Sequence, residues 1–312
     1  MSYHIQEINR RIQTDPKEFV DACDAAYAEK IERAARAIAE NVRTCPIVLL
    51  SGPSGSGKTT TAMKIAEALR GMGIGSQSLA MDDYFRTVNP RTAPRTPEGD
   101  IDFESPACLD MDLLGEHLNA LARGEEIHLP RYNFVTRVQS GPIGRPMRLG
   151  KDEVAVCEGI HALNDDIAAY CPDAFRLYIS ARSIVVDSDG REVFKGTWMR
   201  LLRRLVRDSN FRGTPAAATL DMWANVRRGE KRFISPFKER ANLMFDSSFP
   251  CEVSIMKNFA APLLAAVPEG AERYAEIRSI LPALERFETI DPALLAPESM
   301  LREFIGGGVY SY

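Results

Sequence analysis

The sequence predicts an α/β fold in which helices flank a parallel sheet. From Cys45 onward, short apolar runs alternate with stretches of helical periodicity, which is the pattern of parallel α/β sheets. Each run is apolar almost throughout, as expected for a strand that is covered on both faces. The five candidate strands span residues 47–50, 78–81, 154–157, 176–179 and 253–256.

Composition supports a globular fold and excludes several classes of partner. The chain has 312 residues, of which 45% are hydrophobic and 26% charged, so it can bury a substantial core. With 39 basic and 43 acidic residues its net charge is −4, which gives no overall positive field for nucleic acid or an anionic membrane. No run approaches the 18 apolar residues of a membrane span, and the first 25 residues contain no signal-peptide core. We therefore expect neither nucleic acid nor membrane as a partner.

Cysteine usage indicates a reducing compartment. The six cysteines include no C-x-x-C pair and form no dense framework, so disulfide scaffolds and metal knuckles are not expected. A cytoplasmic protein fits this pattern best.

Residues 1–44 are predicted to form a helical extension. Asp15, Pro16 and Glu18 have the spacing of a capping box with proline at the first helical position. Apolar residues then recur from Val20 to Val42 at the spacing of one helical face, which predicts packing on a core.

A glycine-rich motif follows the first candidate strand. Residues 52–59 fit G-x-x-x-x-G-K-[ST] in full and precede a predicted helix that ends near Arg70. Small residues allow consecutive backbone N–H groups to point at phosphate oxygens, and the helix N-terminus adds partial positive charge. Lys58 is expected to reach the β- and γ-phosphates, and the Thr59 hydroxyl to bind Mg²⁺. The predicted phosphate-binding residues are Gly52, Ser54, Gly55, Ser56, Gly57, Lys58, Thr59 and Thr60. This motif makes the predicted fold a P-loop NTPase-type sheet that binds a nucleoside triphosphate.

Acidic residues follow two more candidate strands. Asp82 and Asp83 come directly after the second strand, where a carboxylate can accept a proton or help to hold Mg²⁺. Glu158 follows the third strand, a position suited to a metal or water ligand. The alternatives are an Asp pair that caps a turn and an ordinary glutamate at a strand end.

Arginines gather on one face of a predicted helix. Arg200, Arg203, Arg204 and Arg207 follow helical spacing, only Asp208 opposes them nearby, and Arg212 comes soon after. The segment 200–232 carries nine basic and three acidic residues, which suits a lid that closes over a polyphosphate. A solvated amphipathic helix is the alternative. Residues 86–106 are predicted to form a long irregular, proline-containing loop, and the tail from about 259 is predicted to be helical.

In their order along the chain, these segments resemble the uridine kinase and phosphoribulokinase family of P-loop kinases. The resemblance covers about 46–257 and is closest to bacterial uridine kinase-like proteins with added terminal helical extensions. It rests on GPSGSGKTT at 52–60, MDDYF at 81–85, DFESP at 102–106, LPRYNF at 129–134, CEGIHAL at 157–163, RLLRRLVRD at 200–208 with RG at 212–213, and FISPFKERANLMF at 233–245. It implies an N-terminal extension over 1–44, a kinase domain over 45–258 with a lid at about 198–232, and a C-terminal extension over 259–312.

The resemblance implies phosphoryl transfer with ATP and Mg²⁺. Asp82 falls where these kinases keep the base for the ribose 5′-hydroxyl, with Lys58, Arg204 and Arg207 as further catalytic residues. Thr59, Asp82 and Glu158 fall where Mg²⁺ is held, and Arg212 where a lid arginine grips the triphosphate.

The resemblance also implies an acceptor site. Glu104 matches a carboxylate that binds the ribose hydroxyls, and Tyr132 and Phe134 match aromatic residues that flank the base. Asp83 and Arg137 complete the expected substrate-binding residues. The implied activity is transfer of the γ-phosphate of ATP to the 5′-hydroxyl of a small nucleoside-like acceptor, uridine first.

Three positions depart from the uridine kinase pattern, and all concern recognition of the base. Arg137 stands where a histidine is usual, Thr214 where an arginine is usual, and Met222 near the place of a glutamine. Residues 183–197 form an insertion that is expected to be a hairpin or a loop. The departures leave open a kinase for another small alcohol or a sugar phosphate. An ATP-binding regulatory or scaffold protein is the alternative of another class, and homo-oligomerisation is left open.

Overall fold

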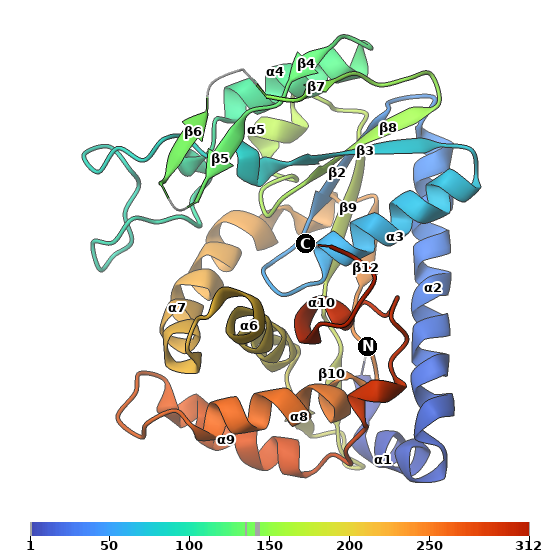
Figure 1. Ribbon diagram of the computed structural model, residues 1–312, viewed down its shortest axis with the longest axis vertical. Coiled ribbons are helices and arrows are strands. Elements are labelled where there is room, and N and C mark those ends of the chain that lie inside the picture. The colour runs from blue at the N-terminus through green and yellow to red at the C-terminus, as the bar shows by residue number, and fades with distance from the viewer. Residues whose placement is uncertain (1, 135, 141–143, 312) are drawn as a thin grey trace.

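A computed structural model describes residues 2–134, 136–140 and 144–311. Its centre is a five-stranded, entirely parallel sheet with the strand order β12-β9-β2-β8-β3, and helices flank this sheet (Figure 1). The strands are β2 (Ile47–Ser51), β3 (Gly75–Ala80), β8 (Glu153–Glu158), β9 (Phe175–Ser180) and β12 (Leu243–Asp246). The predicted fold class is confirmed, and every strand of this sheet ends at the same edge.

One candidate strand was wrong. Residues 253–256 belong to helix α8 (Glu252–Ala265), and the fifth strand is β12. Val253, Ser254, Ile255 and Met256 are all buried, so this part of α8 has no polar face. A short apolar run of that kind cannot be assigned to helix or strand by periodicity alone. The run 78–81 also extends too far, because Met81 begins the 3₁₀ helix η1 (Met81–Tyr84).

Each face of the sheet has its own buried core. One core contains α3 (Lys58–Gly71), α6 (Gly196–Arg212), α7 (Ala216–Gly229) and α8, and it includes both terminal extensions. The other contains α4 (Met111–Ala122), α5 (Asp165–Ala168) and the end of the π-helical turn η3 (Glu230–Ile234), which leads into η4 (Ser235–Arg240). This double cover explains why the central strands are apolar on both sides.

The N-terminal extension begins with a strand, not with the predicted helix. Strand β1 (Ser2–His4) pairs in parallel with β10 (Ile184–Val186), which pairs with β11 (Glu192–Phe194). The insertion 183–197 is therefore a hairpin. Backbone N–H and C=O groups on the free edge of β10 have partners only if another segment pairs with them, which explains why residues 2–4 form a strand. Helices α1 (Ile5–Thr14) and α2 (Pro16–Asn41) follow, and the Asp15 side chain accepts from the Glu18 N–H as predicted.

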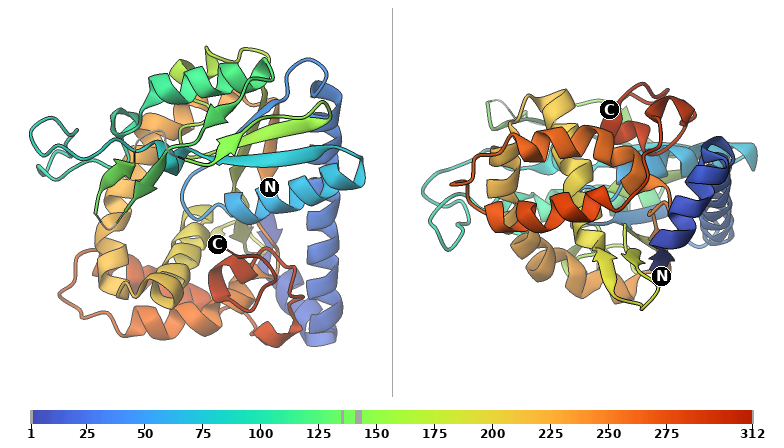
Figure 2. Two further views of the ribbon diagram at one scale, coloured as in Figure 1. Left: turned by 45° about the horizontal axis from the view of Figure 1, so that its top comes forward. Right: turned by 90° about the horizontal axis from the view of Figure 1, so that it is seen from below.

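The C-terminal extension wraps around one side of the molecule, from α8 back to α3. Helix α8 leads to α9 (Tyr274–Glu285), the 3₁₀ turn η5 (Pro292–Leu294) and the short helix α10 (Arg302–Ile305). The tail returns to the sheet edge and reaches α3, where the Tyr310 hydroxyl donates to Glu67. Figure 2 shows α1 and the C-terminal helices on the same side of the molecule.

The predicted irregular loop lies between η1 and η2 (Pro106–Cys108), and small sheets follow it. They are β4 (Ile127–His128) with β7 (Pro146–Met147), and β5 (Arg131–Asn133) with β6 (Val138–Ser140). Within the described residues, no helix has the length and apolar character needed to cross a membrane.

Candidate active site

The glycine-rich motif forms a tight loop between β2 and α3. Gly55 and Gly57 have φ angles of 73° and 76°, the left-handed region that glycine adopts at little cost. A Cβ on Gly55 would lie 2.8 Å from the Arg200 carbonyl oxygen, so α6 packs directly against the loop. Lys58 is the first residue of α3, and its Nζ donates to the Pro53 carbonyl at 3.3 Å. The loop therefore presents a helix N-terminus and a half-buried cation at the carboxyl edge of the sheet.

Carboxylates surround the Lys58 ammonium group. Burial lowers the pKa of Lys58, and the charges of Glu158, Glu303 and Asp82 oppose that shift. Glu158 ends β8, and Asp82 lies in η1 directly after β3. The structure thus brings together the lysine and the two strand-end acids that the sequence singled out.

Burial also shifts the pKa values of Asp82 and Glu158. It raises the pKa of Asp82, and the nearby charge of Lys58 acts in the opposite direction. It raises the pKa of Glu158 in the same way, while Lys58 and a hydrogen bond from Thr59 favour the charged form. An elevated pKa makes Asp82 a stronger proton acceptor than an exposed aspartate, which suits a general base.

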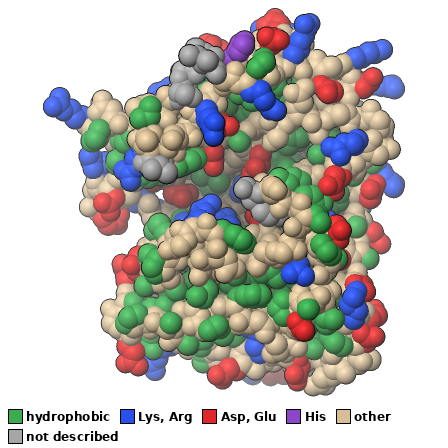
Figure 3. All heavy atoms as spheres, in the orientation of Figure 1, with side chains coloured by type: hydrophobic (Ala, Val, Ile, Leu, Met, Phe, Trp, Pro, Cys, Tyr) green, Lys and Arg blue, Asp and Glu red, His purple; other side chains and the backbone are tan. Residues whose placement is uncertain are grey.

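Three arginines of the predicted lid converge on one carboxylate. Asp208 is buried in α6, and it pairs with Arg204 at 3.2 Å, Arg207 at 3.0 Å and Arg212 at 3.4 Å. Arg204 also donates to the Ser54 hydroxyl of the glycine-rich loop at 3.0 Å. One carboxylate cannot neutralise three guanidinium groups, so this cluster keeps a net positive charge beside the loop. Figure 3 shows basic and acidic side chains together in a cleft between the part that carries β4–β7 and the helices below.

The other two arginines of the helix face have a structural role, contrary to the predicted single phosphate-binding face. Arg200 forms a bidentate pair with Glu230, with hydrogen bonds of 3.0 and 2.6 Å. Arg203 is fully buried and pairs with Glu252. These acids follow the arginines by 30 and 49 positions, so a local count of charges does not include Glu252.

The predicted acceptor residue Glu104 lies at the end of the long loop. Asp102 anchors this loop through an ion pair of 3.2 Å with Arg228, and the Glu104 side chain packs against Gly229 at the end of α7. Burial raises the pKa of Glu104 to about 7, against the opposing charge of Arg204. Asp82 and Lys58 also act on this pKa, so the carboxylate belongs to the same site.

Three aromatic rings lie together at the end of η1. The rings of Tyr132 and Phe134 are 4.9 Å apart, and both contact Phe85, which follows η1. Phe134 is 60% exposed and is available for stacking. Arg137 places its guanidinium 5.4 Å from the ring centre of Phe103, which precedes Glu104 in the sequence. The backbone N–H of Tyr132 donates to Asp83, which ties that acid to β5.

Sequence reasoning gave no role to two residues at the site. His161 is buried against Phe233 and close to the Glu104 backbone, and burial lowers its pKa to about 4, so the ring is neutral at physiological pH. Its position three residues after Glu158 is the sequence signal that places it near the site. Glu303 lies 145 positions beyond Glu158 along the chain, and nothing in its local sequence connects it to the glycine-rich loop.

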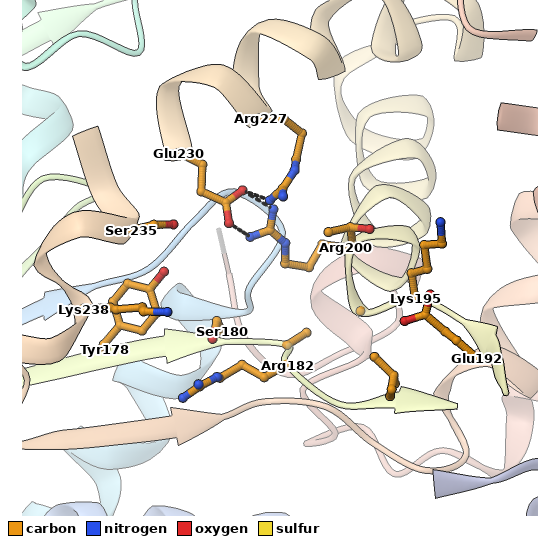
Figure 4. Close-up of a pocket in the computed structure, with 14 residues that line it drawn as sticks. Tyr178, Ser180, Arg182, Glu192, Lys195, Arg200, Arg227, Glu230, Ser235 and Lys238 are labelled. Atoms are coloured by element: carbon orange, nitrogen blue, oxygen red, sulfur yellow. Dashed lines mark hydrogen bonds and ion pairs between the residues drawn. The ribbon is translucent and has the colours of Figure 1, made fainter. Parts of the chain in front are cut away.

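A separate open cavity of about 450 Å³ lies at the end of β9 (Figure 4). The Arg200–Glu230 pair forms part of its wall, together with Arg182 and Lys238. Lys58, Asp82 and Glu158 do not line this cavity, so it is distinct from the candidate active site.

Comparison with known proteins assigns the family. The sequence model of the "Phosphoribulokinase / Uridine kinase family" matches residues 47–253. The chain belongs to this family. The uridine kinase of Staphylococcus haemolyticus (strain JCSC1435) is 29% identical over 210 residues, 67% of this chain and 91% of that protein. The uridine kinase of Deinococcus deserti is 29% identical over 199 residues, 64% of this chain and 86% of that protein.

A solved kinase structure from Silicibacter sp. TM1040 covers 69% of this chain and 98% of its own, with 20% identity and a TM-score of 0.48. As a member of the phosphoribulokinase/uridine kinase family, the chain is a P-loop kinase. The matched region contains the glycine-rich loop, both strand-end acids and the arginine helix, and it leaves α1, α2 and the C-terminal tail outside.

Proposed function

We propose that this kinase transfers the γ-phosphate of ATP to the 5′-hydroxyl of a nucleoside, with uridine as the first candidate. The observation that carries the proposal is the convergence of Lys58, Asp82 and Glu104, which act on one another electrostatically beside the glycine-rich loop. A phosphate-binding cation, a base and a hydroxyl-binding carboxylate are the parts that this transfer needs. The names of the similar uridine kinases support uridine as the acceptor.

In the proposed reaction, Asp82 accepts the proton of the acceptor hydroxyl as the hydroxyl oxygen attacks the γ-phosphorus. The bond to the β-phosphate oxygen breaks, and ADP carries away that electron pair. Lys58, Arg204 and Arg207 stabilise the charge on the transferred group, since all three are buried or half-buried near the loop. Glu104 accepts from the ribose hydroxyls, and the aromatic group around Phe134 stacks on the base.

The residues present fit a magnesium ion. Thr59, Asp82 and Glu158 offer one hydroxyl and two carboxylates, the oxygen donors that Mg²⁺ prefers. Among the described residues, no group of three or more His, Cys, Asp or Glu is arranged to hold a metal. When bound with ATP, Mg²⁺ would neutralise charge on the phosphates.

The compartment proposed for the kinase is the cytoplasm. All six cysteines are free and buried, as a protein kept in reducing conditions allows.

The direct test of the proposal is a coupled assay of ADP release over a panel of nucleosides with MgATP. Uridine is expected to stimulate turnover, with cytidine and the purine nucleosides as comparisons. If no nucleoside stimulates ADP release while ATP still binds, the proposed acceptor is wrong.

Asp82→Asn tests the proposed base. Because an amide cannot take up the proton at neutral pH, kcat should fall by at least about 100-fold. The affinity for ATP, measured by calorimetry, should change little, since the loop and Lys58 remain. A comparable loss of ATP binding would contradict the assigned role.

A second candidate acceptor is a small alcohol that carries an anionic group. Arg137 favours it, because no ion pair of this guanidinium occurs among the described residues and the side chain lies beside Phe103, next to Glu104. In that case Arg137→Ala should raise KM for the anionic acceptor and leave KM for ATP unchanged. An acceptor preference that is the same in both proteins would remove the reason for this candidate.

A further inference from the structure

The C-terminal tail places a carboxylate on the first turn of α3, directly after the glycine-rich loop. One oxygen of Glu303 accepts from the Thr60 hydroxyl at 2.6 Å and from the Thr60 backbone N–H at 3.3 Å. Glu303 belongs to α10, whereas Thr60 is the third residue of α3. Glu303 is 7% exposed, so this contact lies inside the molecule and is not a surface pair.

The position of this contact is one that a nucleotide phosphate should take. N–H groups in the first turn of a helix have no partner within the helix, and in a glycine-rich loop they bind phosphate oxygens. A carboxylate and a phosphate oxygen are both anionic acceptors, and they compete for the same N–H and hydroxyl of Thr60. The charge of Glu303 also acts on Lys58, the other group expected to bind phosphate.

We infer that Glu303 is an internal competitor for a phosphate subsite of the kinase, and that its carboxylate leaves Thr60 when a nucleotide polyphosphate binds. The C-terminal extension thereby makes nucleotide binding weaker than the glycine-rich loop alone would make it. This inference rests on the proposed use of ATP.

The packing around α10 indicates which part moves. Met300, Leu301 and Phe304 are fully buried, and the Met300 sulfur lies against Gly57. The Phe304 carbonyl accepts from Asn210 of α6 at 3.3 Å, and Ser299 donates to Asp24 of α2 at 2.8 Å. These anchors hold the backbone of α10 in place, so the required motion is a rotation of the Glu303 side chain.

The same anchors connect the competitor to the arginine helix. Asn210 lies one turn after Arg207, and the Arg203 guanidinium is 5.2 Å from the centre of the Phe304 ring. A nucleotide that draws Arg204 and Arg207 toward its phosphates therefore acts on the helix that contacts α10. Displacement of Glu303 and closure of the arginines over the phosphates are expected to occur together.

The test compares the binding of ADP, inorganic tripolyphosphate and adenosine by the full chain and by two variants. Glu303→Gln keeps the shape and an acceptor oxygen but removes the charge. It should bind ADP and tripolyphosphate about tenfold more tightly, because a hydrogen bond to a neutral acceptor is weaker and repulsion is lost. Affinity for adenosine, which has no phosphate, should stay within twofold.

Glu298→Gln is the matched control, because Glu298 is an exposed glutamate of the same tail. Its affinities should equal those of the unchanged protein. Glu303→Ala, which removes the acceptor altogether, should bind ADP at least as tightly as Glu303→Gln. Unfolding midpoints of all variants confirm that the compared proteins are folded.

Two outcomes would overturn the inference. Unchanged ADP affinity in Glu303→Gln would show that the carboxylate does not compete, and weaker affinity would show that it helps to bind nucleotide. A failure of every protein, the unchanged chain included, to bind ADP or tripolyphosphate would refute the proposed nucleotide site itself. Tight ADP binding without nucleoside turnover would refute only the proposed acceptor.

Discussion

At the site, burial and neighbouring charges shift the pKa values of individual side chains in opposite directions. Glu104 shows this most clearly, because burial raises its pKa to about 7 while Arg204 favours the charged form. A carboxyl group with this pKa is about half ionised at neutral pH. The ionised form offers both oxygens as charged acceptors to the two hydroxyl groups, whereas protonation turns one oxygen into a donor.

Acceptor binding should therefore depend on pH through Glu104. Below about pH 7 the group is protonated, so KM for the nucleoside should rise as pH falls through this value, while KM for ATP stays constant. Initial-rate measurements between pH 5.5 and 8.5 check this. Glu104→Gln should give a uniformly high KM without the pH dependence, and a variant that keeps the dependence would assign it to another group.

The raised pKa also bears on stability, with a definite sign. Between the unperturbed value near 4.5 and about 7, the folded state binds more protons at Glu104 than the unfolded state does. This group therefore makes the protein less stable as pH rises through that interval. In Glu104→Gln, that contribution to the pH dependence of the unfolding midpoint should disappear.

The buried pair of Arg203 and Glu252 should contribute to stability rather than to phosphate binding. Neither side chain is exposed, so Glu252→Gln leaves an uncompensated buried cation. The free energy of unfolding should fall by about 3–5 kcal/mol, as measured by urea denaturation. Glu7→Gln, which breaks an exposed pair with Arg10, should change it far less, because water and salt screen that pair.

The sequence predicts those residues of the site that a local motif or a strand end marks. The glycine-rich loop, Asp82 and Glu158 could be placed because parallel strands bring their carboxyl ends to one edge. Glu303 and the partners of Arg200 and Arg203 could not, because tertiary packing alone brings these distant segments together. The roles of the site residues stay predictions until the variants are measured.

At the scale of elements, the accuracy of each strand prediction depends on how completely the segment is buried. Strands β2, β8 and β9 are central, apolar and short, and they lie where the sequence predicted them within one or two residues. The edge strand β12 was missed because its residues are mostly only half-buried. The sequence pattern favours a strand over 253–256, at the start of α8, because every residue there is buried and no polar face marks the helix.

Helix α1 illustrates how an extension is attached to the core. Ile5, Ile8 and Ile12 form one buried face, and the Asn9 side chain donates to the Arg286 carbonyl at 2.8 Å. Ile8→Ala should lower the free energy of unfolding by about 2–5 kcal/mol, because it leaves a cavity in a buried cluster. Urea denaturation measures this, with the exposed Arg10→Ala as control. Equal stability of the two variants would show that α1 does not support the core.

At the scale of the whole molecule, the extensions and the kinase core share one buried cluster. It runs from Ile5 in α1 through Leu205 in α6 to Phe304 in α10. We therefore expect a single cooperative unfolding transition, since an extension cannot separate without exposing this core. Fluorescence of Trp198 and Trp223, which lie in α6 and α7, should change together with far-ultraviolet circular dichroism. A separate early loss of helical signal would show that the extensions unfold independently.

The pairing of β1 with β10 has a consequence for biosynthesis. Ser2, Tyr3 and His4 are translated long before their partners at 184–186 leave the ribosome. The isoleucines of α1 must wait longer still, until the segment around Arg286 emerges. Contacts between such distant segments form slowly, and apolar surface that waits for them is prone to aggregation. The nascent chain therefore has an interval in which a chaperone at the ribosome would raise the yield of folded kinase.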